Sequence, residues 1–297
     1  MAFFALDEWY SRTQTTFCIK KNYLDESLNT VEVLFVGSSH IQSAINPAFI
    51  NKKSCNLAFG GQPMSIDYFI LEKYIAQMPK LTTIFYEISP HRFYIDLSAN
   101  TWNSYIYANQ YGIDYNTTPS LLKNQLLIGG DIKFFSSIFF DFCNPNSFKF
   151  NVNKFGFTTN EFNDRFLILK HNKMAIDTTY QMQHTFEDQT NFIKNNSFLK
   201  RTVDLCKKHH KKLVFITTPF YKTYSNQLSP EVMDQLKKAI NPYITDAGIP
   251  YLDFSKDERF TVIDFKDDNH LRPAGATKIT TIINNYINQE TLSPTLK

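Results

Sequence analysis

Short apolar runs alternate along the chain with longer segments in which apolar residues recur at helical spacing. The apolar runs, which read as strands, cover residues 31–36, 54–58, 82–88, 212–217 and 249–254. The helical patterns cover residues 63–78, 188–210, 230–247 and 274–289. Apolar runs that alternate with helices are typical of βαβ units with a buried parallel sheet. The pattern predicts a three-layer α/β fold with a flavodoxin-like, doubly wound parallel sheet of about five strands.

The regular pattern fades between about residues 92 and 185, where Asn, Phe and Tyr are abundant. We interpret this region as an insertion in a single domain that spans residues 1–297. Ligand sites of doubly wound sheets lie at the carboxyl ends of the strands. The insertion therefore either shapes a substrate cleft at that edge or simply covers the sheet.

Composition and charge narrow the class of protein. The 297 residues are 43% hydrophobic and 15% aromatic, which is enough to bury a sizeable core. The 31 Lys and Arg residues nearly balance the 28 Asp and Glu residues, so the net charge is only +3. The densest basic cluster, residues 207–212, falls at the predicted end of a helix, where cations are favoured. We therefore expect no nucleic-acid partner.

The cysteine pattern gives no sign of a metal or redox site. The four cysteines lie far apart and form no CxxC pair. They are Cys18, Cys55, Cys143 and Cys206. We expect no metal and no cofactor, and the spacing leaves the disulfide state open.

The first six residues, Met1–Leu6, are apolar and are followed at once by Asp7 and Glu8. The apolar fragment is too short for a signal peptide or a membrane span. Two interpretations stay open: a buried N-terminus, or the remnant of a membrane anchor that belongs to a longer native chain.

A serine directly follows the first predicted strand, in the segment Gly37-Ser38-Ser39-His40. A serine on a tight turn after a buried strand presents its hydroxyl at the carboxyl edge of the sheet, as a nucleophile requires. The same residues also suit an ordinary turn or a helix N-cap.

A second polar segment, Asp267-Asp268-Asn269-His270, precedes the last predicted helix. An aspartate three residues before a histidine can hold Nδ1 of the ring while Nε2 takes a proton from a serine. The alternative is that Asp267 and Asp268 are solvated loop charges and that His270 is an ordinary residue at the start of a helix.

Together, Gly37-Ser38-Ser39, the block from Asn56 to Gly61 and the Asp267–His270 segment resemble the SGNH/GDSL hydrolase superfamily. The resemblance implies an SGNH hydrolase-like α/β fold with Ser39 as nucleophile and with Asp267 and His270 as the other two members of a triad. It also implies that the backbone N–H groups of Ser39 and Gly61 bind the developing oxyanion.

Two departures from the superfamily pattern refine this interpretation. Gly-Ser-Ser replaces the usual Gly-Asp-Ser, which resembles the branch of surface-polymer acyltransferases and esterases, including alginate O-acetyltransferases and the D-alanine transfer protein of lipoteichoic acid synthesis. The asparagine of the third block is not found after the third strand, where His91 stands in its place. His91 is therefore a third candidate oxyanion donor, and the alternative is an ordinary turn histidine.

Our leading hypothesis is a serine-dependent esterase or O-acyltransferase that acts on acyl esters of a carbohydrate or cell-surface polymer. The expected partners are an acylated carbohydrate or small acyl ester and a membrane-bound acyl donor, and the expected location is extracytoplasmic, either periplasmic or at the cell surface. The alternative is a catalytically inactive SGNH-fold protein for polysaccharide binding or assembly. A further reading makes Ser38 the nucleophile. An intact enzyme should place Ser39 Oγ within about 3.2 Å of His270 Nε2.

Overall fold

The computed structural model describes residues 16–95, 107–113, 152–159, 189–226 and 228–292. Contacts divide the chain into a larger unit, 28–95 with 161–297, and a smaller unit, 1–27 with 96–160. Most of the predicted insertion lies outside the described residues. The assignment of one domain to the whole chain stays a prediction.

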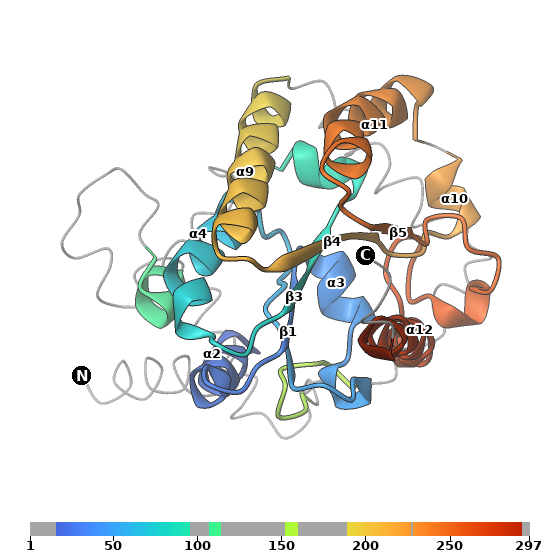
Figure 1. Ribbon diagram of the computed structural model, residues 1–297. Coiled ribbons are helices and arrows are strands. Elements are labelled where there is room, and N and C mark those ends of the chain that lie inside the picture. The colour runs from blue at the N-terminus through green and yellow to red at the C-terminus, as the bar shows by residue number, and fades with distance from the viewer. Residues whose placement is uncertain (1–15, 96–106, 114–151, 160–188, 227, 293–297) are drawn as a thin grey trace, which may run out of the picture. The chain divides into compact units, whose positions relative to one another are not determined.

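The larger unit is built on five parallel strands (Figure 1). They are β1 Val33–Val36, β2 Ser54–Asn56, β3 Thr83–Glu87, β4 Lys212–Thr217 and β5 Tyr251–Asp253. Their order in the sheet is β2-β1-β3-β4-β5. This is the order of flavodoxin-like sheets. The predicted fold class is therefore confirmed.

Helices cover both faces of this sheet. They are α3 Ser39–Ala44, α4 Met64–Tyr74, α9 Gln189–Lys208, α10 Lys222–Ser225, α11 Pro230–Thr245 and α12 Pro273–Leu292. Helix α4 packs beside α9, and α3 packs beside α12 on the opposite face (Figure 1). The strands are thus enclosed in a three-layer arrangement.

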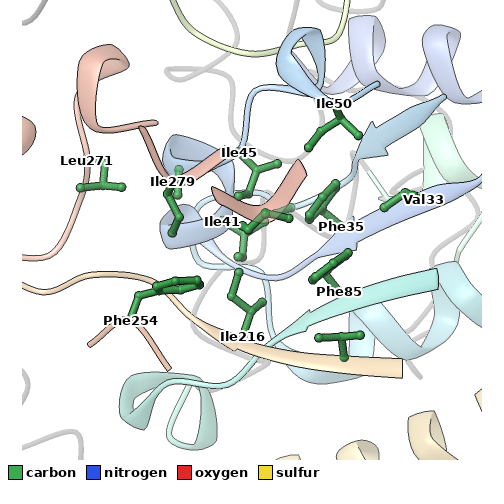
Figure 2. Packing of buried hydrophobic residues seen from close by; sticks show 14 of the residues in the cluster. Val33, Phe35, Ile41, Ile45, Ile50, Phe85, Ile216, Phe254, Leu271 and Ile279 are labelled. Atoms are coloured by element: carbon green, nitrogen blue, oxygen red, sulfur yellow. The ribbon is translucent and has the colours of Figure 1, made fainter. Parts of the chain in front are cut away.

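The alternation of side chains along each strand supplies both faces of the core. Val33 and Phe35 belong to one cluster with Ile41 of α3 and Ile279 of α12 (Figure 2). On β4, Val214 and Ile216 join the same cluster. The side chain of Phe215 points the other way, and its ring centroid lies 6.2 Å from that of Tyr243 in α11. The three central strands, β1, β3 and β4, are buried on both sides, which explains their nearly continuous apolar sequences.

The second strand is shorter than predicted because a side chain intervenes. Asn56 Oδ1 accepts a hydrogen bond from Ala58 N at 3.0 Å, and Asn56 Nδ2 donates to the carbonyl oxygens of Ile41 and Ile45 at 3.0 and 2.8 Å. These bonds turn the chain after Asn56 and fix the end of α3. The predicted strand 54–58 therefore ends at Asn56.

The smaller unit contains α2, Thr16–Ser27, and a π-helical turn, Tyr107–Tyr111. Within it, Tyr107 is buried and meets Phe17 edge-on, with 5.8 Å between ring centroids. Cys18, Cys55 and Cys206 are buried, and Cys143 lies outside the described residues.

Candidate active site

Ser39 is the first residue of α3, at the carboxyl end of β1. Gly37 adopts a φ of 155°, and Ser38 is the N-cap of the helix. The Ser38 hydroxyl accepts the N–H of His40 at 3.5 Å. The capping role considered from the sequence therefore belongs to Ser38, and Ser39 is half-buried at the start of the helix.

The second segment forms a small closed loop before α12. The N–H of Lys266 donates to the carbonyl of His270 at 3.0 Å and closes the loop. Asp267 Oδ1 accepts the backbone N–H groups of Asn269 and His270 at 3.2 and 2.8 Å. The backbone of its own loop thus holds the Asp267 side chain, which is not a free solvated charge.

The structure brings Ser39, His270 and Asp267 together. His270 Nε2 lies 2.7 Å from Ser39 Oγ, although 231 residues separate them, and His270 Nδ1 lies 2.9 Å from Asp267 Oδ1. The side chains of His270 and Asp267 are each 20% exposed, so a substrate can reach the three groups from solvent. A base within about 3.2 Å of a hydroxyl can accept its proton.

Asp267 is ionised at neutral pH. Burial by itself would raise the pKa of this carboxyl, but the imidazole of His270, the charge of Lys266 and the N–H of Asn269 outweigh burial and lower the pKa to about 2. A permanent carboxylate behind Nδ1 fixes the ring tautomer and stabilises an imidazolium.

Ser38 faces a different set of groups. Its N–H lies 2.5 Å from Glu87 Oε2, and its Oγ lies 2.9 and 3.0 Å from the two carboxylate oxygens. Ser38 is 1% exposed, and no bond from it to His270 is found among the described residues. The geometry therefore favours Ser39 over Ser38 as the nucleophile.

His91 lies on the 3₁₀ turn Pro90–Phe93 directly after β3. Its Nε2 is 3.0 Å from Ser38 Oγ and its Nδ1 is 3.1 Å from Ser89 Oγ. Both ring nitrogens are thus engaged by serine hydroxyls. Its role as an oxyanion donor stays a prediction.

His40, Glu87 and His91 form a buried group in which the potential ligand atoms all lie within 4.8 Å of one another. Two histidines and a carboxylate could hold a divalent metal. The hydroxyl of Ser38, however, already bridges Glu87 and His91. Hydrogen bonds thus account for the Glu87–His91 pair, and the expectation that the site uses no metal stays a prediction.

The loop of the predicted donor Gly61 lies beside Ser39. A Cβ built on Gly60 would be 3.9 Å from Ser39 Cβ, and Phe59 N donates to the Gly37 carbonyl at 3.2 Å. Gly61 has a φ of 68°, in the left-handed region that favours glycine. The loop is thus tied to the nucleophile turn, and the donor role of Gly61 stays a prediction.

A buried ion pair anchors the far end of that loop. Arg92 contacts Asp67 of α4 and donates to the Gln62 carbonyl at 2.5 Å. Gln62 Nε2 in turn donates to Asp67 at 2.5 Å. All three side chains are 0% exposed. The chain just after β3 therefore fixes the glycine loop.

The sequence interpretation did not assign a role to Glu87, Asp67 or Arg92. Glu87 could have been noticed as a charged residue in an otherwise apolar predicted strand, because such a residue is rarely buried without partners. Asp67 and Arg92 gave no such signal, since both fall in segments where charges are common.

The chain is similar to one protein family and to several solved structures. A family described as DltD protein matches residues 153–288. This match confirms the resemblance to the SGNH/GDSL hydrolase superfamily. No curated protein matches the sequence. Among the described residues, no helix has the length and apolar character needed to cross a membrane.

Several solved structures are similar to the chain. A proposed acylhydrolase from Bacteroides fragilis is 12% identical, with 91% of this chain and 96% of that chain covered and a TM-score of 0.46. A GDSL-like lipase from Bacteroides thetaiotaomicron is 11% identical, with 92% and 99% covered and a TM-score of 0.43. A lipase/acylhydrolase from Enterococcus faecalis is 10% identical, with 88% and 97% covered and a TM-score of 0.39.

Proposed function

We propose that this chain, which resembles the SGNH/GDSL hydrolases, is a serine-dependent esterase or O-acyltransferase that acts on acyl esters of a carbohydrate or cell-surface polymer. The observation that carries the proposal is the 2.7 Å contact between Ser39 Oγ and His270 Nε2, with Asp267 2.9 Å behind the ring. Nucleophile, base and orienting carboxylate are the three groups that acyl transfer needs.

In this mechanism, Ser39 Oγ attacks the acyl carbonyl carbon while His270 Nε2 takes the hydroxyl proton. The tetrahedral intermediate collapses as His270 returns that proton to the leaving alkoxide, which gives an acyl-enzyme on Ser39. Water or a sugar hydroxyl then attacks the acyl-enzyme, with His270 again as base. Asp267 accepts a hydrogen bond from Nδ1–H throughout and stabilises the positive charge on the ring.

The oxyanion is stabilised in this proposal by the backbone N–H groups of Ser39 and Gly61. Preorganised donors that point at the developing charge supply a large part of the rate enhancement in such sites. His91 is less suited to this role, because its ring nitrogens face Ser38 and Ser89.

The polymer substrate, the extracytoplasmic location and a membrane-bound acyl-donor partner are proposed from the Gly-Ser-Ser resemblance. The triad geometry is common to hydrolysis and transfer, so it leaves both acceptors, water and a sugar hydroxyl, within the proposal. Transfer requires that a sugar hydroxyl outcompete water for the acyl-enzyme.

One observation favours a second candidate, a catalytically inactive protein for polysaccharide binding or assembly. The third-block asparagine is replaced by His91, whose ring is held by Ser38 and Ser89. A site with a weakened oxyanion hole could keep the fold and lose turnover.

The test is hydrolysis of p-nitrophenyl acetate by the intact protein and by Ser39→Ala and His270→Ala. We expect each variant to lose about 10⁴-fold or more in kcat/KM. His209→Ala, just after α9 and before β4, serves as the matched control at the other end of the strands and should keep the intact rate. Turnover that survives in Ser39→Ala would contradict the proposal, and an intact protein without turnover would favour the binding protein.

A further inference from the structure

A second carboxylate, Glu87, lies directly behind the nucleophile turn. Glu87 is the last residue of β3, and its side chain is 0% exposed. Strands β1 and β3 are neighbours in the sheet, with Val36 paired to Tyr86. The sheet therefore carries the Glu87 carboxylate to the turn that follows β1.

The contacts of Glu87 with this turn are close and numerous. Its carboxylate accepts the Ser38 N–H at 2.5 Å and lies within 3.0 Å of the Ser38 hydroxyl. A Cβ placed on Gly37 would fall 2.5 Å from Glu87 Oε2 and 2.7 Å from Glu87 Cβ. Glycine is thus required at position 37 both by its φ of 155° and by the carboxylate.

The surroundings of Glu87 favour its charged form. Burial would raise the pKa of Glu87, but hydrogen bonding to His40 and the charges of Arg92, His40 and His91 outweigh burial and hold the pKa well below its usual range. Ser89 Oγ donates to Glu87 Oε1 at 2.7 Å. A buried carboxylate with several donors is a strong and directional anchor.

The residue before the nucleophile, Ser38, carries no carboxylate of its own, and the carboxylate beside it comes from Glu87 of β3. In the Gly-Asp-Ser form of this motif, a carboxylate stands one residue before the nucleophile, whereas here that residue is Ser38. An aspartate at position 38 would put a second negative charge beside Glu87, and like charges so close cannot both ionise cheaply. Serine instead donates to the carboxylate.

We propose that Glu87 is the positioning residue of the nucleophile turn, and that it supplies from β3 the carboxylate that Gly-Asp-Ser carries within the turn. This inference rests on the proposed function, because the group being positioned is the Ser39 nucleophile. Glu87 acts through Ser38 and touches neither Ser39 nor the substrate.

The inference is tested by moving the carboxylate. Glu87→Gln keeps the size of the side chain and removes its charge, Ser38→Asp adds a second charge, and the double variant returns one carboxylate to the turn. Glu32→Gln, at the opposite end of the sheet, is the matched control. The readouts are kcat and KM on p-nitrophenyl acetate, the rate of fluorophosphonate labelling and the thermal midpoint.

We expect Glu87→Gln to lower kcat by about 10- to 100-fold with KM little changed, because a displaced nucleophile slows the chemical step more than binding. Labelling should fall in parallel. Ser38→Asp alone should also lose activity, whereas the double variant should recover about tenfold over Glu87→Gln. Glu32→Gln should match the intact protein.

If Glu87→Gln fails to fold, Ser38→Ala is measured in its place. It removes the hydroxyl contact with Glu87 together with the contacts to His91 Nε2 and the His40 N–H, and it should lower kcat several-fold. Intact kcat in Glu87→Gln or in Ser38→Ala would overturn the inference, and so would a double variant no better than Glu87→Gln. An intact protein that neither turns over nor labels would overturn the proposed function and this inference with it, which distinguishes the two failures.

Discussion

Two polar networks meet at the carboxyl edge of the sheet, and they differ in how the chain assembles them. The Asp267–His270 pair is made within one loop, between residues three apart. The Glu87–Ser38 pair joins residues that are 49 apart, one at the end of β3 and the other in the turn after β1. The first network can be recognised in the sequence, whereas the second exists only once β1 and β3 lie side by side.

The difference also extends to exposure. His270 and Asp267 are each 20% exposed and can meet a substrate. Glu87 is fully buried and meets only protein groups. The local, accessible network is therefore suited to chemistry, and the non-local, buried network is suited to holding the backbone. Three substitutions test this difference between the networks.

The largest effect is expected at the local network. Asp267→Asn keeps the shape of the side chain but removes the negative charge that holds the His270 tautomer. We expect kcat to fall by about 10⁴-fold. The measurement is steady-state hydrolysis of p-nitrophenyl acetate together with the thermal midpoint. A loss of about 100-fold or less in a folded variant would contradict the comparison, since Asp267 would then act by positioning alone, as Glu87 is proposed to do.

An intermediate effect, on stability, is expected at the buried pair that anchors the glycine loop. Arg92→Met leaves Asp67 buried without its counter-charge, and we expect a loss of about 3 kcal/mol or more in the free energy of unfolding. The measurement is urea unfolding. The double variant Arg92→Met with Asp67→Asn should recover much of the loss.

The exposed pair Lys200–Asp204, on α9, is the control for that change. Lys200→Met should leave the unfolding midpoint nearly unchanged, because exposed ion pairs contribute little. Equal losses of stability in Arg92→Met and Lys200→Met would show that burial does not set the strength of these two ion pairs.

The smallest effect on stability is expected at Asp268, which belongs to the local loop of Asp267 and His270 but is buried like Glu87. It is 1% exposed and its carboxylate oxygens have no hydrogen-bond partner in the described part of the chain. Burial, and then the charge of Asp267, raises the pKa of Asp268 to about 6. Because folding raises the pKa of this carboxyl, its contribution to the free energy of unfolding is most favourable below about pH 4. That contribution is lost as the pH rises through 6.

Asp268→Asn should therefore increase the free energy of unfolding by about 2 kcal/mol at pH 7.5 relative to the intact protein. At pH 4 the gain should fall to about 0.5 kcal/mol, since the carboxyl of the intact protein is then protonated in the folded state and about half protonated in the unfolded state. Urea unfolding of the two proteins at both pH values measures the difference, and a gain of equal size at both would contradict the assigned cause.

The fold could be predicted because the apolar runs record burial directly. Each of the five strands was found within a few residues, and the early end of β2 depends on hydrogen bonds from Asn56 that no hydrophobic pattern encodes. Residues 207–212 fall where α9 ends and β4 begins, as the charge pattern predicted.

The site could be predicted only where its residues are neighbours in the chain. Asp267 and His270 are close in sequence, and Ser39 follows a strand that the pattern identifies. The interpretation did not assign a role to Glu87 or His40, because their proximity depends on the order of strands in the sheet. The ring centroid of His40 lies 5.0 Å from that of His270 and 4.1 Å from that of His91.

The central claim is that Ser39, and not Ser38, carries the acyl group. The most direct measurement is to label the protein with a fluorophosphonate and locate the adduct by mass spectrometry of the peptide that contains both serines. The account predicts a single adduct on Ser39 that disappears in His270→Ala. An adduct on Ser38, or labelling that persists at full rate in His270→Ala, would contradict it.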